Sequence, residues 1–265
     1  MPQTEQCDRI IFLGSGGARI VVAKQVRASG GIFFCLDGTK FLVDPGPGAL
    51  VRMTASRHDL NPADLDGILL SHRHLDHAGD VNNMVEAMTM GGTQRRGVLF
   101  APADALEGDD PVVLHYLRAF LREIVTLKQA GEYRLGTVRF SCPVRHRHRG
   151  EVYGFKFEVP GLSVSYIADT AYFPDLADCY RADVVILNVV RLEQSELDHL
   201  HVPEAIELVK AMKPTLAVIS HFGMTMIRAR PWVVAEKMSQ ETGCKVIAAS
   251  DGRLLDLAEY RRKDA

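Results

Sequence analysis

The chain has 265 residues, 47% of which are hydrophobic, and its formal net charge is −2 at pH 7. This length allows one large core or two small ones, and the small charge excludes a general attraction to nucleic acid or to anionic membranes. Because residues 1–9 are polar and no apolar stretch reaches a membrane-spanning length, we expect no membrane partner.

The five cysteines are odd in number and scattered along the chain, and none forms a C-x-x-C pair. They predict neither a disulfide framework nor a zinc site built on thiolates. We therefore expect a cytoplasmic protein, with one domain over residues 1–265.

The first part of the chain predicts strands joined by glycine-rich turns. A short apolar run, residues 10–13, ends in Gly-Ser-Gly-Gly, and Arg19 replaces the third glycine of a dinucleotide-binding pattern. A tight turn beside a cleft is therefore expected there. Strands over 31–36 and 40–43 are joined by Asp-Gly, a strong hairpin signal. Asp44 follows, either as the partner of a metal-binding histidine or as an ordinary turn residue.

Helical periodicity appears over residues 49–56 and 81–90, and a strand is expected over 98–101. Asp-Asp-Pro at 109–111 is a typical helix start and predicts a helix over 112–127. Its apolar face would belong to the core, with a lid or a dimer contact as the alternatives.

The rest of the chain alternates strands and helices. Helices are predicted over 203–212 and 231–242, and strands over 137–140, 144–148, 152–159, 163–168, 184–187, 216–220 and 245–248. This order favours a layered α/β protein with its sheets inside.

The densest group of reactive side chains is Ser-His-Arg-His-Leu-Asp-His at residues 71–77, directly after the apolar run 68–70. A loop at a strand end lets such side chains converge. Three histidines and one carboxylate provide nitrogen and oxygen ligands for first-row metals, and their spacing suits two ions better than one. The alternative is a solvated polar turn.

Three other predicted strands carry candidate ligands, at or near their ends. The strand over 144–148 would place His146 and His148 on one face, and two later strands end in Asp169 and His221. Each signal is weak alone, but strand ends at one sheet edge share a rim with the first cluster.

The order His72-x-His74-x-Asp76-His77, a strand histidine, residues 166–170 and residues 219–221 resembles the metallo-β-lactamase superfamily. The resemblance extends to residues 12–17 and 43–46. It implies a four-layer αββα sandwich, the metallo-β-lactamase fold, with two metal ions. The implied ligands of one ion are His72, His74 and a third histidine; those of the other are Asp76, His77 and His221, and Asp169 bridges the two.

Within the superfamily, the chain is similar to the ribonuclease Z and phosphodiesterase branch. There the third histidine precedes a glycine–aromatic pair, which favours His148 before residues 154–155 over His146. His146 would then contact substrate or merely lie nearby. The segment 157–163 is too short for the tRNA-binding arm of ribonuclease Z, so tRNA processing is not expected.

The same branch has a histidine that supports phosphate or the leaving group, and His201 matches its place, with His199 as the alternative. The branch also has a glutamate after the strand that here ends in Asn188, so the usual orienting partner of that histidine is missing from this chain. By resemblance, the catalytic residues would be Asp76 and His201, and the substrate-binding residues His146 and His201.

This ligand set predicts a dinuclear metal-dependent hydrolase. Two ions, zinc first and manganese second, would lower the pKa of a bridging water and supply hydroxide. A phosphodiester is the expected substrate, as a small molecule, a nucleotide or RNA. The alternative is a carboxylic ester, lactone or thioester hydrolase. A diiron redox enzyme is disfavoured by His74, where that branch has a glutamate. A homodimer is a further expectation from the resemblance.

Overall fold

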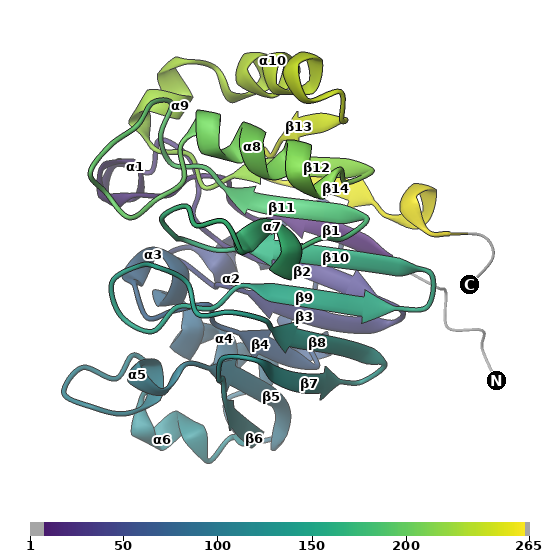
Figure 1. Ribbon diagram of the computed structural model, residues 1–265. Helices are drawn as coiled ribbons and strands as arrows, with labels where there is room; N and C mark the ends of the chain where they lie inside the picture. Colours follow the sequence, from purple (N-terminus) through teal and green to yellow (C-terminus); the bar gives the residue numbers. More distant parts are fainter. Residues whose placement is uncertain (1–7, 263–265) are drawn as a thin grey trace.

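The computed structural model describes residues 8–262, which form two β-sheets packed face to face (Figure 1). The first sheet has the order β14-β1-β2-β3-β4-β5-β6. Its strands are β1 Arg9–Phe12, β2 Ile32–Leu36, β3 Thr39–Val43, β4 Gly67–Leu69, β5 Arg96–Ala101, β6 Leu121–Thr126 and β14 Arg253–Asp256.

The second sheet has the order β13-β12-β11-β10-β9-β8-β7. Its strands are β7 Gly131–Leu135, β8 Val138–Cys142, β9 Phe155–Val159, β10 Leu162–Ile167, β11 Val184–Asn188, β12 Leu216–Ser220 and β13 Val246–Ala248.

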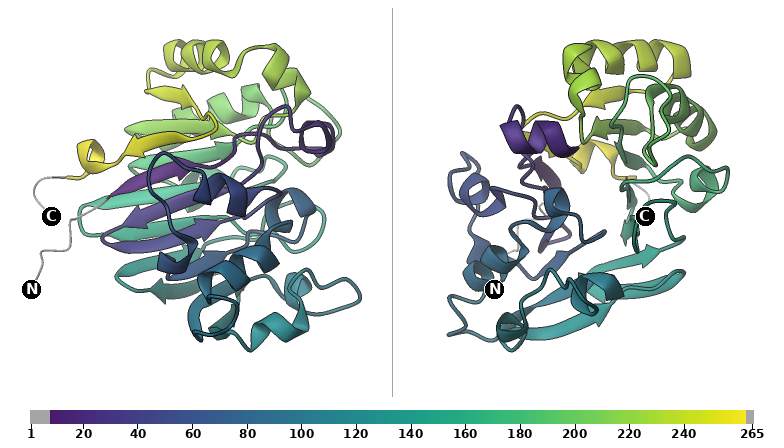
Figure 2. Two further views of the ribbon diagram at one scale, coloured as in Figure 1. Left: turned by 180° about the vertical axis from the view of Figure 1, so that it is seen from behind. Right: turned by 90° about the vertical axis from the view of Figure 1, so that its left-hand side faces the viewer.

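Helices lie on the outer side of each sheet, so the molecule has the predicted αββα layers (Figure 2). On the side of the first sheet or at its edges lie α1 Arg19–Lys24, α2 Ala49–Thr54, η1 Pro62–Asp64, α3 Leu75–Ala78, α4 Val81–Met88, α5 Ala103–Leu106 and α6 His115–Arg118. On the side of the second sheet or after it lie α7 Leu176–Cys179, α8 Val202–Met212, α9 Met224–Arg228, α10 Pro231–Thr242 and η2 Ala258–Tyr260. Within the described residues, no helix is long and apolar enough to cross a membrane.

Aromatic side chains join the two sheets at the centre of the core. Phe34 of β2 and Phe41 of β3 stack with their ring centroids 5.0 Å apart. Both contact Phe157 of β9, at 5.2 and 5.1 Å. All three are buried, and burying a side chain of this size contributes about 2–3 kcal/mol each. This packing fixes the sheets relative to one another.

The sheet topology brings the candidate ligands to one edge. Strands β3, β4 and β5 are parallel, as are β10, β11 and β12. The segments after β4, β10 and β12 therefore leave the sheets at the same edge, as expected for parallel strands. This edge carries α3 and lies at the opposite end of the strands from the β9–β10 turn (Figure 1).

The predicted hairpin at Asp37 and Gly38 is confirmed, with φ values of 46° and 80° as a tight two-residue turn requires. The helix predicted over 112–127 is wrong: only α6 is helical, and β6 follows it. Residues 124–126 are β-branched and pair with β5, which stabilises a strand over the helix that the leucine spacing suggested.

The strand predicted over 144–148 is also wrong. This segment is a loop, held to residue 153 by a single bridge between Arg145 and Tyr153. The other strands and helices predicted after residue 130 are present with ends shifted by at most a few residues, and β7 and β14 are additional strands.

Candidate metal centre

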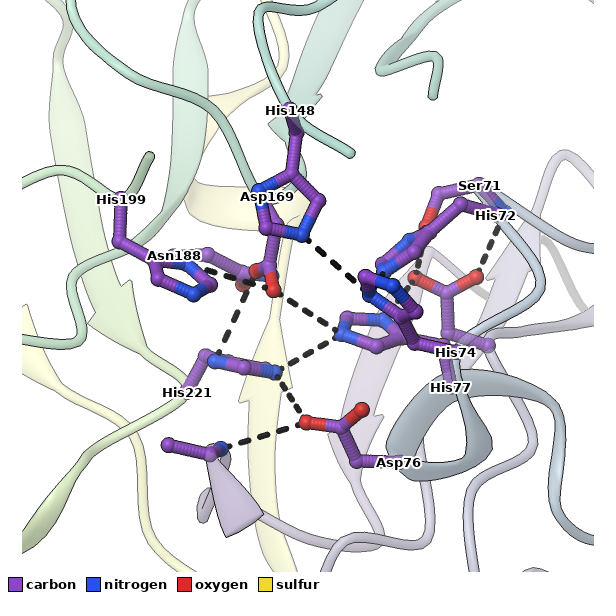
Figure 3. Close-up of polar contacts among 12 residues, drawn as sticks. Ser71, His72, His74, Asp76, His77, His148, Asp169, Asn188, His199 and His221 are labelled. Atoms are coloured by element: carbon purple, nitrogen blue, oxygen red, sulfur yellow. Dashed lines mark hydrogen bonds and ion pairs between the residues drawn. The ribbon is translucent and has the colours of Figure 1, made fainter. Parts of the chain in front are cut away.

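The first group of candidate ligands consists of His72, His74 and His148 (Figure 3). Nδ1 of His74 lies 3.0 Å from Nε2 of His72 and 3.3 Å from Nε2 of His148. His72 follows β4, His74 is the residue before α3, and His148 lies in the 144–153 loop. Three ring nitrogens from two separate segments therefore point at one place.

The second group consists of Asp76, His77 and His221. Asp76 and His77 lie in the single turn of α3, and His221 directly follows β12. The Nε2 atoms of His77 and His221 are 2.9 Å apart, and Oδ2 of Asp76 lies 3.5 Å from Nε2 of His221.

Asp169 lies between the two groups. Its Oδ2 is 3.4 Å from Nε2 of His77, its Oδ1 is 3.6 Å from Nδ1 of His221, and it also clusters with His72. Burial alone would raise its pKa, but the surrounding histidines hold that pKa well below its usual value. The structure thus brings together all seven side chains that the resemblance implied as ligands.

The electrostatics of the cluster suit cations. Burial, followed by neighbouring histidine charge, lowers the pKa of His72 and His74, which keeps their ring nitrogens available as lone-pair donors. Burial also opposes a charge on His77, but Asp169, Asp44 and Asp76 outweigh it and raise its pKa well above the usual value.

The donor set itself tests whether metal ions fit. Imidazole nitrogens and carboxylate oxygens are ligands of zinc and other first-row ions. The buried Nδ1 atom of His221 has no hydrogen-bond partner among the described residues, although it faces Asp169. The donor types of these seven residues therefore fit divalent metal ions, and Asp169 lies within reach of both groups.

Asp44 orients two of these histidines. Its Oδ2 accepts hydrogen bonds from Nδ1 of His77 at 2.9 Å and from Oγ of Ser71 at 2.7 Å. Oγ of Ser71 in turn lies 2.9 Å from Nδ1 of His72. Both histidines thereby turn Nε2 toward the cluster, an arrangement that fixes the tautomer of a metal ligand. Asp44 is thus the partner of a candidate ligand, which resolves the two alternatives.

Asn188 and Asp198 hold two further candidate ligands. The side-chain amide of Asn188 donates to Oδ1 of Asp169 at 2.9 Å and to the hydroxyl of Tyr166 at 3.1 Å. His148 donates from Nδ1 to the backbone carbonyl of Asp198 at 2.8 Å. The sequence did not reveal these contacts, because each joins residues far apart in the chain.

The glycine-rich segment after β1 packs against the second group. A Cβ atom at Gly17 would lie 2.0 Å from Nδ1 of His221, so only glycine leaves room for that ring. The backbone N–H of Ala18 donates to Oδ2 of Asp76 at 3.2 Å. The turn therefore lies beside the metal centre, as its sequence predicted.

His146 does not face the site. Its ring is buried, with Nε2 2.9 Å from the hydroxyl of Tyr180 and Nδ1 3.3 Å from the backbone carbonyl of Asp169. Burial is the main cause that lowers its pKa to about 4. Since both nitrogens are engaged inside the protein, the substrate contact predicted for His146 is corrected. His148, which the sequence favoured, is the histidine that groups with His72 and His74.

His201 is also placed elsewhere than predicted. It precedes α8 as its N-cap, its backbone N–H donates to Glu204, and its Nε2 lies 3.3 Å from Oε1 of Glu204. His199 faces the cluster instead, with Nδ1 3.5 Å from Oδ2 of Asp169 and its ring centroid 4.7 Å from that of His148. The alternative that the sequence left second is the one whose side chain reaches the site.

A shared carboxylate between two histidine-rich ligand groups, at the edge of an αββα sandwich, defines the class of metal-dependent hydrolases. A family model described as "Beta-lactamase superfamily domain" matches residues 39–222. The chain belongs to the metallo-β-lactamase superfamily. It is 32% identical to an uncharacterized protein of Methanocaldococcus jannaschii, MJ1374, over 263 residues that cover 96% of this chain and 97% of the relative.

Solved structures share the fold at lower identity. The metallo-β-lactamase fold protein YhfI of Bacillus subtilis has a TM-score of 0.78 at 17% identity, covering 94% of this chain and 99% of its own. A diphosphatase of the PhnP family has a TM-score of 0.68 at 19% identity, covering 94% and 96%. The short form of human tRNase Z has a TM-score of 0.65 at 18% identity, covering 94% and 98%.

Proposed function

We propose that this protein is a dinuclear metal-dependent phosphodiesterase that acts on a small or nucleotide phosphodiester, or on RNA. Zinc is the proposed ion, with manganese as the second choice for this mixed nitrogen and oxygen ligand set. Fold neighbours that are named as a diphosphatase and as a tRNase Z support a phosphate ester over other substrates. We further propose a cytoplasmic protein, and a homodimer as its assembly.

His199 is the observation that carries the phosphodiester proposal. It lies beside Asp169 and His148 with its side chain partly exposed, so it can reach a substrate bound at the metal centre. Burial is the main cause that lowers its pKa to about 4, against the opposing effect of Asp169. His199 is therefore neutral at pH 7, and it would donate a ring N–H to a phosphoryl oxygen or to the leaving oxygen.

The remaining residues would hold the centre rigid during the reaction. Divalent ions bound there would make water nucleophilic at neutral pH and polarise the phosphorus centre. Asp169, held by Asn188, fixes the separation of the two ligand groups. Asp44 keeps Nε2 of His77 directed at the site. Positions set in advance by such contacts lower the cost of reorganisation in the transition state.

A carboxylic ester, lactone or thioester hydrolase is the second candidate, because aliphatic side chains are exposed next to the ligands. Leu75, between His74 and Asp76, is 73% exposed. Leu197, whose carbonyl accepts from the backbone N–H of His199, is also exposed. An apolar acyl group would find contact area there.

Hydrolysis of bis(p-nitrophenyl) phosphate by the zinc- or manganese-loaded protein tests the proposal. p-Nitrophenyl esters, a lactone and a thioester are assayed in parallel. We expect turnover of the phosphodiester that His74→Ala abolishes, and His199→Asn to lower kcat by about 10²-fold or more. If the protein hydrolyses only the carboxylic ester, lactone or thioester substrates, the phosphodiesterase proposal is wrong and the second candidate is favoured.

The matched control for His199→Asn is His201→Asn. It changes a histidine of the same loop whose ring contacts Glu204 rather than the cluster. If His201→Asn lowers kcat more than His199→Asn, while both proteins retain their metal, the role proposed for His199 is wrong.

A further inference from the structure

Within residues 8–262, no helix covers the outer face of β7, β8 and β9. In Figure 1 these strands lie open to the viewer, whereas α7 and α8 cover the neighbouring part of the same sheet. A groove of about 770 Å³ lies on this open face, near the β7–β8 and β9–β10 turns. Because Asp169 follows the far end of β10, the groove is separate from the metal centre.

Five cationic side chains from four separate segments line this groove, with Glu158 as the acidic lining residue. The cations are Arg134, Arg139, Lys156, Arg181 and Arg262. The chain as a whole carries a net charge of −2, so this concentration of positive charge is local. A basic concave surface raises the local concentration of anions.

The backbone register places like charges side by side. Arg134 of β7 lies directly opposite Arg139 of β8, and like charges in this arrangement destabilise a sheet. Glu158 lies opposite Arg139 on β9, yet within residues 8–262 neither arginine nor Lys156 forms an ion pair. An anion in the groove would remove this repulsion.

The other two cations are partly engaged. Arg181 donates from Nη1 to the backbone carbonyls of Ala211 and Met212 at 2.8 and 3.1 Å. Arg181 pairs with Asp178 at 3.3 Å and Arg262 with Asp183 at 3.6 Å. Their side chains are nevertheless 52% and 67% exposed. An arginine fork has five N–H donors, so each of these side chains can still donate to a phosphate while its carboxylate and, for Arg181, its two backbone contacts stay in place.

The extent and composition of the groove indicate its ligand. The cations are spread over β7, β8, β9 and the segments beyond them. At the usual strand spacing, β7 and β9 alone are about 10 Å apart, which one phosphate cannot span. None of the described residues that line the groove is aromatic, so bases would find no stacking platform among them. The large exposed hydrophobic residues also lie elsewhere, which leaves a protein partner without an anchor.

We propose that this groove binds the phosphate backbone of a single-stranded nucleic acid, without reading its bases. The contacts are electrostatic and run across the strands from Arg134 and Arg139 to Arg181. This binding requires neither the metal ions nor the proposed phosphodiesterase activity.

Fluorescence anisotropy of a labelled oligouridylate tests the proposal, with the metal-loaded protein and with salt varied from about 50 to 200 mM. The double variant Arg139→Gln/Lys156→Gln is compared with the control Arg122→Gln/Lys237→Gln, which removes the same charges from exposed positions outside the groove. We expect the groove variant to bind at least tenfold more weakly. In a plot of the logarithm of its binding constant against the logarithm of the salt concentration, the slope should be less steep by about 1.4, which is about 0.7 for each lost phosphate contact. The control should match the wild type.

Several results would overturn the proposal. The first is an absence of binding by the wild type, and the second is equal weakening of binding in both double variants. The third comes from a competition experiment, in which polyglutamate and polyphosphate of equal charge displace the oligonucleotide equally well. An oligothymidylate arm distinguishes RNA from DNA, and a gel verifies that the oligonucleotide stays intact. If the double variant loses its fold by circular dichroism, Arg134→Gln replaces it, with Arg122→Gln as the control. Unchanged hydrolysis of bis(p-nitrophenyl) phosphate by the groove variant keeps this test independent of the proposed activity.

Discussion

Oδ2 of Asp44 lies 2.9 Å from Nδ1 of His77, and both side chains are buried. The same oxygen accepts hydrogen bonds from Oγ of Ser71 and from the hydroxyl of Tyr166. Because Ser71 also contacts His72, one carboxylate orients a histidine of each ligand group. The two ligand groups are therefore coupled through a residue that belongs to neither of them.

Asp44→Asn should weaken metal binding. The variant removes the charge and one acceptor, which frees the rings of His77 and His72 to turn. We expect zinc affinity to fall by about 10–100-fold, as for partners of other ligating histidines. Zinc titration against a competing chelator measures this change. Ser71→Ala, which leaves the contact between Asp44 and His77 intact, should have a smaller effect. Equal zinc affinity of Asp44→Asn and the wild type would show that the contact is dispensable.

Gly17→Ala should displace the ring of His221, because the added methyl would lie 2.0 Å from Nδ1. The backbone N–H of Gly17 donates a hydrogen bond to the carbonyl of Phe222, so the turn cannot move away freely. We expect the variant to retain less zinc than the wild type while it keeps its fold. Gly30→Ala is the control, since its methyl meets no atom closer than 3.2 Å. Full zinc occupancy in Gly17→Ala would contradict this prediction, because it would show that the turn shifts to make room for the methyl group without displacing His221.

His146 should make the protein less stable in acid. Its pKa is lowered to about 4 by burial, so the unfolded chain binds a proton at this residue more readily than the folded one. Stability therefore rises with pH between about 4 and the ordinary histidine value of about 6.5, and it is lost as the pH falls through this window. Urea unfolding at several pH values should show that the free energy of unfolding depends less steeply on pH in His146→Gln than in the wild type. An identical dependence in both proteins would contradict the assignment.

Phe157→Ala should destabilise the core between the sheets. The ring contacts Phe34 and Phe41 across the interface, and its loss leaves a cavity. We expect a decrease of about 3–5 kcal/mol in the free energy of unfolding, measured by urea denaturation. Tyr116→Ala, at an exposed position, should cost less than about 0.5 kcal/mol. A similar decrease in the free energy of unfolding of both variants would argue against the packing of Phe157 between the two sheets.

The structure brings together the candidate ligands named from the sequence, and their signals in the sequence are local. Residues 72–77 hold four ligands in one short segment, and Asp169 and His221 each follow an apolar strand that points to the shared edge. The roles of Gly17 and Asn188 depend on contacts with distant residues, which no local pattern encodes.

The wrong predictions have physical causes as well. In the 144–148 segment a strand would have aligned His146 and His148, but the loop turns one inward and the other to the cluster. His199 and His201 differ through their neighbours: Glu204 holds His201 at the start of α8. Leucine spacing over 112–127 imitates a helix, whereas pairing with β5 determines the strand.

The central claim is that the seven gathered side chains hold two metal ions that share Asp169. The most direct measurement is the zinc content per chain by elemental analysis, after loading with excess zinc and exhaustive dialysis. We predict two zinc ions per chain in the wild type and fewer in Asp169→Ala. A wild-type protein that retains one ion or none, or an Asp169→Ala variant that still retains two, would contradict this account.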